Sequence, residues 1–150
     1  MTIPMEETPA SPRRLRRSVA AVLLGFVVVF VLSLGTDQAL HLVNVYPPWG
    51  QPMWDTGLNL LALAYRLVYD TFGSYITARF APHAPMRHAM AGGVLGLALC
   101  TLGAVVAMPL KLGPAWNPIL LALSTLPTAW LGGMLYQRQQ TPPTFDAATS

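Results

Sequence analysis

Four apolar segments follow one another along the chain, separated by short polar connections. They cover residues 18–36, 55–79, 88–109 and 117–136. A helix rises about 1.5 Å per residue and needs about 20 residues to cross the hydrocarbon of a bilayer, so each segment is long enough to span a membrane. Because lipid offers the backbone no hydrogen-bond partners, helices are expected rather than isolated strands. The pattern predicts an all-α membrane protein, a four-transmembrane-helix bundle.

The two ends of the chain differ from these segments. Residues 1–17 contain Pro, Thr and a basic cluster, and residues 138–150 are rich in Thr, Pro and Ala, so both are expected to be disordered tails around a membrane domain of residues 18–137. The basic cluster RRLRR followed by an apolar run imitates a signal peptide. However, the run is longer than a usual signal core and no convincing A-x-A site follows it. The first segment is therefore expected to be retained as a span.

Composition supports lipid as the solvent. The chain is 53% hydrophobic and only 10% charged, with a mean hydropathy of +0.47, which leaves too little polar surface for a water-soluble globule. The net charge of +3 is not arranged as a basic stripe with interleaved aromatics, so no nucleic-acid partner is expected. The single Cys100 has no second cysteine in the chain to pair with.

The basic residues indicate the orientation. Seven arginines lie before the first segment, around the connection between the second and third, or after the fourth: Arg13, Arg14, Arg16, Arg17, Arg79, Arg87 and Arg138. Only Lys111 lies on the other side. By the positive-inside rule, both termini are expected in the cytoplasm of a bacterium, with the chain multi-pass in the cytoplasmic (inner) membrane.

The second segment carries charges near its middle. At 100° per residue, Asn59, Arg66, Asp70 and Thr77 share one face. A charge at the bilayer centre costs about 2.5 to 3.5 kcal/mol, so this face should be shielded from lipid. The candidate intramembrane polar site is Asn59, Tyr65, Arg66, Tyr69, Asp70 and Thr77.

Two interpretations of Arg66 and Asp70 remain open. They form an ion pair along one helix that locks the packing of the bundle, or they belong to a polar pathway for a small ion, a proton or a polar solute. A site for a lipid headgroup or a partner helix is a third possibility. The second segment is expected to insert poorly without neighbouring helices.

A second polar cluster is expected at the outer end of the first segment. Asp37 and His41 lie four residues apart on one helical face, and Asp55 starts the second segment. Asp37, His41 and Asp55 are metal-ligand types, but two ligands on one helix are a weak signal and no metal is assigned. A solvated helix end in which Asp37 bonds His41 is the simpler expectation.

Small residues indicate how the helices pack. The third segment places Gly93, Gly96 and Gly103 on one line, and the fourth offers Gly133. Such faces let membrane helices approach closely. The partner of this groove is either the second segment or another copy of the chain, which leaves a homo-oligomer or a membrane-complex partner open.

Enzymatic motifs are not found. The sequence has no Gly-rich phosphate loop, nucleophile elbow or H-E-x-x-H pattern, so no catalytic residue, cofactor or metal is assigned and no enzyme is expected.

Several short motifs carry a family resemblance. They are YPPWGQPM at residues 46–53, YR at 65–66, G-x-Y-x-x-A-R at 73–79, PMRH at 85–88 and GPAW at 113–116. With these motifs, the chain from Asp37 to about Leu135 resembles an uncharacterised family of short bacterial inner-membrane proteins with four predicted spans. The resemblance implies the fold and brings no activity with it. The sequence thus predicts a small structural or accessory membrane subunit, with a small-solute or ion permease as the alternative.

Overall fold

The computed structural model describes residues 12–141, and every regular element in this range is a helix. The elements are α1 (Pro12–Leu42), α2 (Thr56–Phe80), α3 (Pro85–Ala107), the short 3-10 helix η1 (Met108–Leu110) and α4 (Trp116–Gln140). The predicted all-helical class is confirmed. Three helical stretches are long and apolar enough to cross a membrane: Arg13–Leu42, Pro85–Leu110 and Trp116–Gln140. The charged helix α2 is not among them.

Both ends of the membrane domain are longer than predicted. Residues 12–17 form the start of α1, and α4 continues to Gln140, although both stretches were assigned to disordered tails. Arg and Leu are strong helix formers, and Pro12 occupies a first helical position where its missing N–H costs nothing. The remaining parts of the predicted tails lie outside the described residues.

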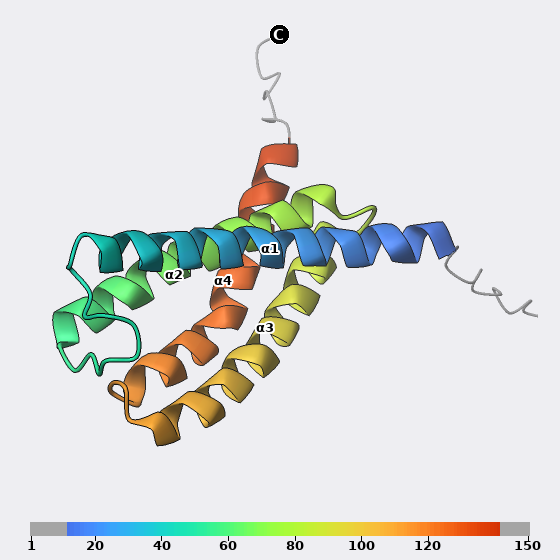
Figure 1. Cartoon of the computed structure of the whole chain (residues 1–150). Coiled ribbons are helices and arrows are strands. Elements are labelled where there is room, and N and C mark those ends of the chain that lie inside the picture. The colour runs from blue at the N-terminus through green and yellow to red at the C-terminus, as the bar shows by residue number, and fades with distance from the viewer. Residues whose placement is uncertain (1–11, 142–150) are drawn as a thin grey trace, which may run out of the picture.

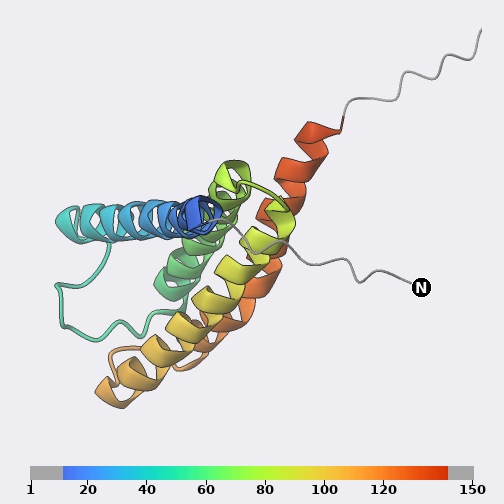
Figure 2. The same ribbon diagram turned by 90° about the vertical axis from the view of Figure 1, so that its right-hand side faces the viewer.

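The helices pack as two antiparallel pairs, α1 with α2 and α3 with α4 (Figure 1). The most extensive interfaces join α4 to α2 and to α3, and α1 packs chiefly on α2. The C-terminal part of α1 diverges from α3 and α4 (Figures 1 and 2). Helix α2 thus lies between α1 and α4.

Hydrogen bonds tie α2 to α4 at both ends. At one end, the Met53 N–H donates to the Leu112 carbonyl oxygen at 2.7 Å, joining the two connections that flank these helices. At the other end, the Tyr75 hydroxyl donates to Gln139 Oε1 at 2.6 Å. Helix α2 therefore runs alongside α4 for most of its length.

The interior is built from small side chains. Among the described residues no large side chain is fully buried, and the buried hydrophobic residues are seven alanines and Tyr46. Large apolar side chains lie outside instead; Phe30, Val68 and Leu123 are 67%, 63% and 64% exposed. This distribution is the reverse of a water-soluble core and suits helices that pack closely while lipid covers their outer faces.

Two of the four predicted packing glycines lie at tight contacts. A Cβ on Gly93 would stand 2.5 Å from that of Ala129, and one on Gly133 would stand 2.8 Å from Met86 Sδ. A Cβ on Gly96 would make an ordinary contact, and one on Gly103 would meet nothing within 4 Å. The groove therefore covers only part of α3, and α4 fills it; the whole-length groove predicted for this helix is wrong.

The close approach of α1 to α2 at two glycines was not predicted. A Cβ on Gly25 of α1 would lie 2.6 Å from the carbonyl oxygen of Gly73, and one on Gly73 would lie 2.8 Å from that of Gly25. The two backbones touch at this crossing, so a side chain on either glycine would push α1 away from α2.

Candidate functional site

A polar network joins the outer end of α1 to α2. Helix α1 continues past its apolar part and ends at Leu42. This extension places Asp37 next to Arg66 and Tyr65 of α2. Arg66 Nη2 donates to Asp37 Oδ2 at 2.8 Å, and the Tyr65 hydroxyl donates to Asp37 Oδ1. The Arg66 guanidinium also lies 5.6 Å from the centre of the Tyr65 ring. Both carboxylate oxygens of Asp37 are therefore satisfied by α2.

Of the interpretations left open for Arg66 and Asp70, the ion pair between them along α2 is wrong. Within residues 12–141, Arg66 pairs with Asp37 and with no other carboxylate. Along a helix, a cation four residues before an anion is the less favourable order. Asp37 comes from the neighbouring helix and meets the guanidinium directly. The pair is partly shielded, with 27% of the Arg66 side chain and 14% of the Asp37 side chain exposed.

Tyr46, in the connection between α1 and α2, closes the network. Its side chain is buried, and its hydroxyl donates weakly to the Leu58 carbonyl oxygen at 3.4 Å and to the Tyr65 hydroxyl at 3.5 Å. Burial raises the pKa of the Tyr46 hydroxyl above its ordinary value. Tyr46 thus stays protonated and remains a donor at neutral pH.

The outer cluster predicted from Asp37, His41 and Asp55 does not converge. Asp37 bonds α2 rather than His41. The His41 ring packs 4.1 Å from that of Trp49, and its buried Nδ1 has no hydrogen-bond partner among residues 12–141. Asp55 caps α2 by accepting the Leu58 N–H at 2.8 Å. In the described part of the chain, no three His, Cys, Asp or Glu side chains are placed to hold a metal ion.

Two further members of the predicted intramembrane site make contacts within the chain. The buried Asn59 amide donates to the Met53 and Asp55 carbonyl oxygens at 2.9 and 2.8 Å, and Asn117 donates to the Asn59 carbonyl oxygen at 2.8 Å. Tyr69 shares a hydrogen bond of 2.9 Å with Thr36. These side chains join α2 to its neighbours.

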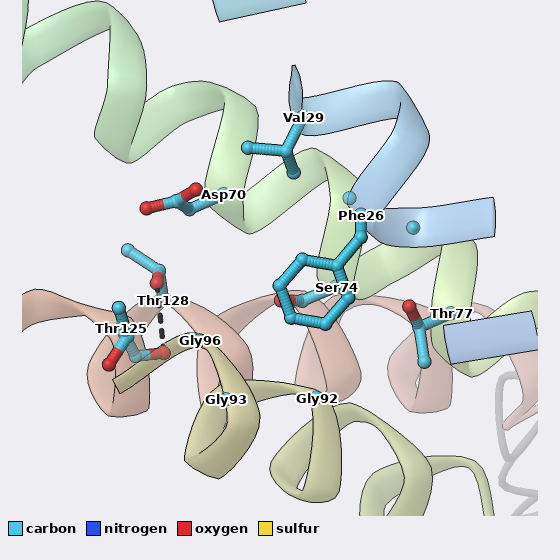
Figure 3. A pocket seen from close by; sticks show the side chains of 12 residues that line it. Phe26, Val29, Asp70, Ser74, Thr77, Gly92, Gly93, Gly96, Thr125 and Thr128 are labelled. Carbon is cyan, nitrogen blue, oxygen red and sulfur yellow. Dashed lines mark hydrogen bonds between the residues drawn. The ribbon is translucent and has the colours of Figure 1, made fainter. Parts of the chain in front are cut away.

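Asp70 lies apart from this network, at a small cavity where the four helices meet (Figure 3). The cavity has a volume of about 50 Å³. Four hydroxyl-bearing residues line it with Asp70, together with five glycines and two apolar side chains: Ser74, Thr77, Thr125, Thr128, Gly25, Gly73, Gly92, Gly93, Gly96, Phe26 and Val29. No hydrogen bond within residues 12–141 reaches the Asp70 carboxylate. The cavity is large enough for a water molecule or a small ion.

Two of the three threonines at this cavity, Thr125 and Thr128, donate their hydroxyl hydrogens to backbone carbonyl oxygens of α4. Thr125 donates to the Ala122 carbonyl oxygen at 2.8 Å, and Thr128 donates to that of Ser124 at 2.9 Å. A hydroxyl whose hydrogen is engaged in this way offers only lone pairs to other partners. Oxygen acceptors beside a carboxylate suit a proton, water or a hard cation.

The cavity is only partly foreseeable from the sequence. Asp70 and Thr77 share a helical face and were predicted to be together. The contribution of Thr125 and Thr128 was missed; three hydroxyls near Pro127 in an apolar helix were the available signal.

Comparison with protein-family models, with curated proteins and with solved structures gives no match to this chain.

Proposed function

We propose that the chain is a four-span integral membrane protein of the bacterial cytoplasmic membrane, with both termini inside. Helix α2 has 25 residues, or about 37 Å, and lies between α1 and α4. Its position among apolar neighbours supports a fourth crossing despite its charges.

Within this frame, the chain acts as a small structural or accessory membrane subunit without enzymatic activity. The observation that carries this proposal is how the polar groups of α2 are used. Asn59, Arg66 and Tyr69 each bond another part of the same chain. Groups committed in this way stabilise the bundle and are not free to line a solute path.

Reconstitution tests the subunit proposal. Protein in liposomes is expected to show no flux of H⁺, Na⁺ or K⁺ above that of empty liposomes, while Asp37→Ala and Arg66→Ala lower accumulation in the membrane. Arg138→Ala is the control, because it removes an exposed charge that has no ion-pair partner among the described residues and lies outside the network. A clear flux through the parent protein would overturn the proposal.

A permease for a small ion is the second candidate, and the Asp70 cavity favours it. The carboxylate has no partner within the described residues and faces oxygen acceptors in the middle of the bundle. This candidate predicts a flux that Asp70→Asn abolishes without lowering accumulation, because the amide keeps the size and loses the charge. A flux that survives Asp70→Asn would remove the cavity from any pathway.

A further inference from the structure

The N-terminal part of α1 and the first turns of α3 enclose an apolar groove. These helices pass beside each other near the start of α3 (Figures 1 and 2) and share the least extensive of the contacts between the long helices. The groove has a volume of about 390 Å³. Its walls include Val19 and Leu23 from α1 with Ala91 and Leu95 from α3. These side chains leave an open apolar channel at the surface of the bundle.

A polar pocket lies at one end of this groove. It has a volume of about 270 Å³ and is lined by His83, Ala84, Arg87, His88 and Ala91. His88 and Ala91 line both the pocket and the groove, so the two spaces are contiguous. One molecule with a polar head and an apolar tail can therefore occupy both.

The donors of the pocket suit an anion. The exposed Arg87 has no carboxylate partner within residues 12–141, where the ion pair present joins Arg66 to Asp37. His88 Nδ1 lies 3.2 Å from the Ala84 carbonyl oxygen; this contact favours the tautomer with hydrogen on Nδ1 and leaves Nε2 for another partner. The His83 ring stands edge-on to His88 at 5.0 Å. No carboxylate lines the pocket or the groove.

We propose that this composite site binds one anionic phospholipid. Its phosphate lies against Arg87 and the two histidines, and one acyl chain follows the groove toward Leu95. From His88 to Leu95 the helix rises about 10 Å, so the groove leads from the connection at residues 81–84 into the apolar part of the bundle. Basic pockets between membrane helices are suited to acidic headgroups, and a free phosphate would leave the adjoining groove unused.

Native mass spectrometry of the whole chain in detergent tests the site, with phosphatidylglycerol as the probe and phosphatidylcholine as the neutral comparison. Phosphatidylglycerol is expected to reach half-occupancy at a lipid concentration about tenfold lower than phosphatidylcholine does. Arg87→Gln should remove most of that preference, because the guanidinium is the permanent cation of the pocket. Arg138→Gln is the matched control, since it makes the same change on the exposed end of α4, and it should leave the preference unchanged.

The groove is tested separately. Ala91→Phe keeps the net charge, fills the groove from an exposed position on α3, and should weaken phosphatidylglycerol binding by a similar factor. Glycerol phosphate, which has the headgroup without acyl chains, should compete poorly. If Arg138→Gln loses the phosphatidylglycerol preference as strongly as Arg87→Gln does, the preference reflects general surface charge and the proposal is overturned. Unchanged binding in Ala91→Phe, or strong competition by glycerol phosphate, would overturn it in favour of a simple phosphate site. An unchanged thermal unfolding midpoint shows that each variant is folded.

Discussion

At the scale of single residues, Arg66 is held by the neighbouring helix rather than by its own. Its partner Asp37 also accepts a bond from Tyr65, so removing Arg66 leaves a carboxylate that is only 14% exposed with one donor fewer. This loss is costly because a shielded charge without its partner keeps its desolvation penalty. The pair connects α1 to α2 as well as neutralising charge.

A double-mutant cycle tests this assignment. Arg66→Ala and Asp37→Ala should each lower the free energy of unfolding by about 1 to 3 kcal/mol, and the double variant should cost clearly less than the sum, because the two residues interact directly. Unfolding in detergent, followed by tryptophan fluorescence, measures all three. The same cycle with Asp70→Ala should be closer to additive. Strong coupling of Arg66 to Asp70 instead of Asp37 would contradict the observed pairing.

Tyr46 gives the network a dependence on alkaline pH. Its hydroxyl has a raised pKa in the folded state because of burial, so the folded protein resists ionisation of Tyr46 while the unfolded chain ionises near pH 10. The stability that Tyr46 contributes is therefore complete below about pH 10 and falls as the pH rises above it.

Tyr46→Phe isolates this effect. At pH 7 the variant should lose at most about 1 kcal/mol, because the hydrogen bonds of Tyr46 are long. Between pH 9 and about pH 11 the unfolding midpoint of the parent should fall further than that of Tyr46→Phe. The difference between the two midpoints should therefore shrink as the pH rises. All other ionisable side chains are the same in the two proteins, so their contributions cancel in the comparison. A difference that grows with pH would show that ionised Tyr46 is stabilised in the fold.

At the scale of helices, the crossing of α1 and α2 depends on glycine. The backbones of Gly25 and Gly73 are too close for a Cβ on either residue, and both glycines border the Asp70 cavity. Gly35 lies on the same helix as Gly25, but a Cβ there would meet nothing within 4 Å. The two glycines of α1 are therefore a natural matched pair.

Gly25→Ala should destabilise the protein and Gly35→Ala should not. The new methyl at residue 25 overlaps the carbonyl oxygen of Gly73, and forced overpacking of this kind costs about 1 to 3 kcal/mol. At residue 35 the open position should give a neutral to slightly stabilising change, because alanine is the better helix former. The unfolding midpoints of Gly25→Ala, Gly35→Ala and the parent, measured under the same conditions, test this prediction. Equal effects at both positions would mean that the crossing is looser than the structure shows.

The sequence predicts the helices better than it predicts which side chains pair between them. Four long helices follow from apolar runs of the right length, because that pattern is local. The start of α1 is not revealed by composition, because the polar residues there are also Arg, a strong helix former. The pairing of Arg66 and the role of Gly25 depend on how α1 rotates against α2, which no single-helix periodicity encodes. Gly25 lies four residues after the buried Ala21, and this small-x-x-x-small spacing was the signal available in the sequence.

At the scale of the whole molecule, the path of α2 determines how many times the chain crosses the membrane. By apolarity alone α2 is not a spanning helix. However, it is bonded to α4 at both ends and to α1 through Asp37. Charges carried into a bilayer are tolerated when they face protein and are paired. Helix α2 should therefore cross because its neighbours shield it, and it should fail to insert when they are removed.

Labelling single cysteines with a membrane-impermeant maleimide tests this crossing, starting from a Cys100→Ala background. Gln51→Cys precedes α2 and His83→Cys follows it, and both positions are exposed. In intact cells Gln51→Cys should react, while His83→Cys should react only after the membrane is opened, because a crossing α2 puts them in different compartments. Gln140→Cys at the end of α4 is the control and should behave as His83→Cys does. If Gln51→Cys and His83→Cys react from the same side, α2 does not cross, and Arg66 and Asp70 lie outside the hydrocarbon.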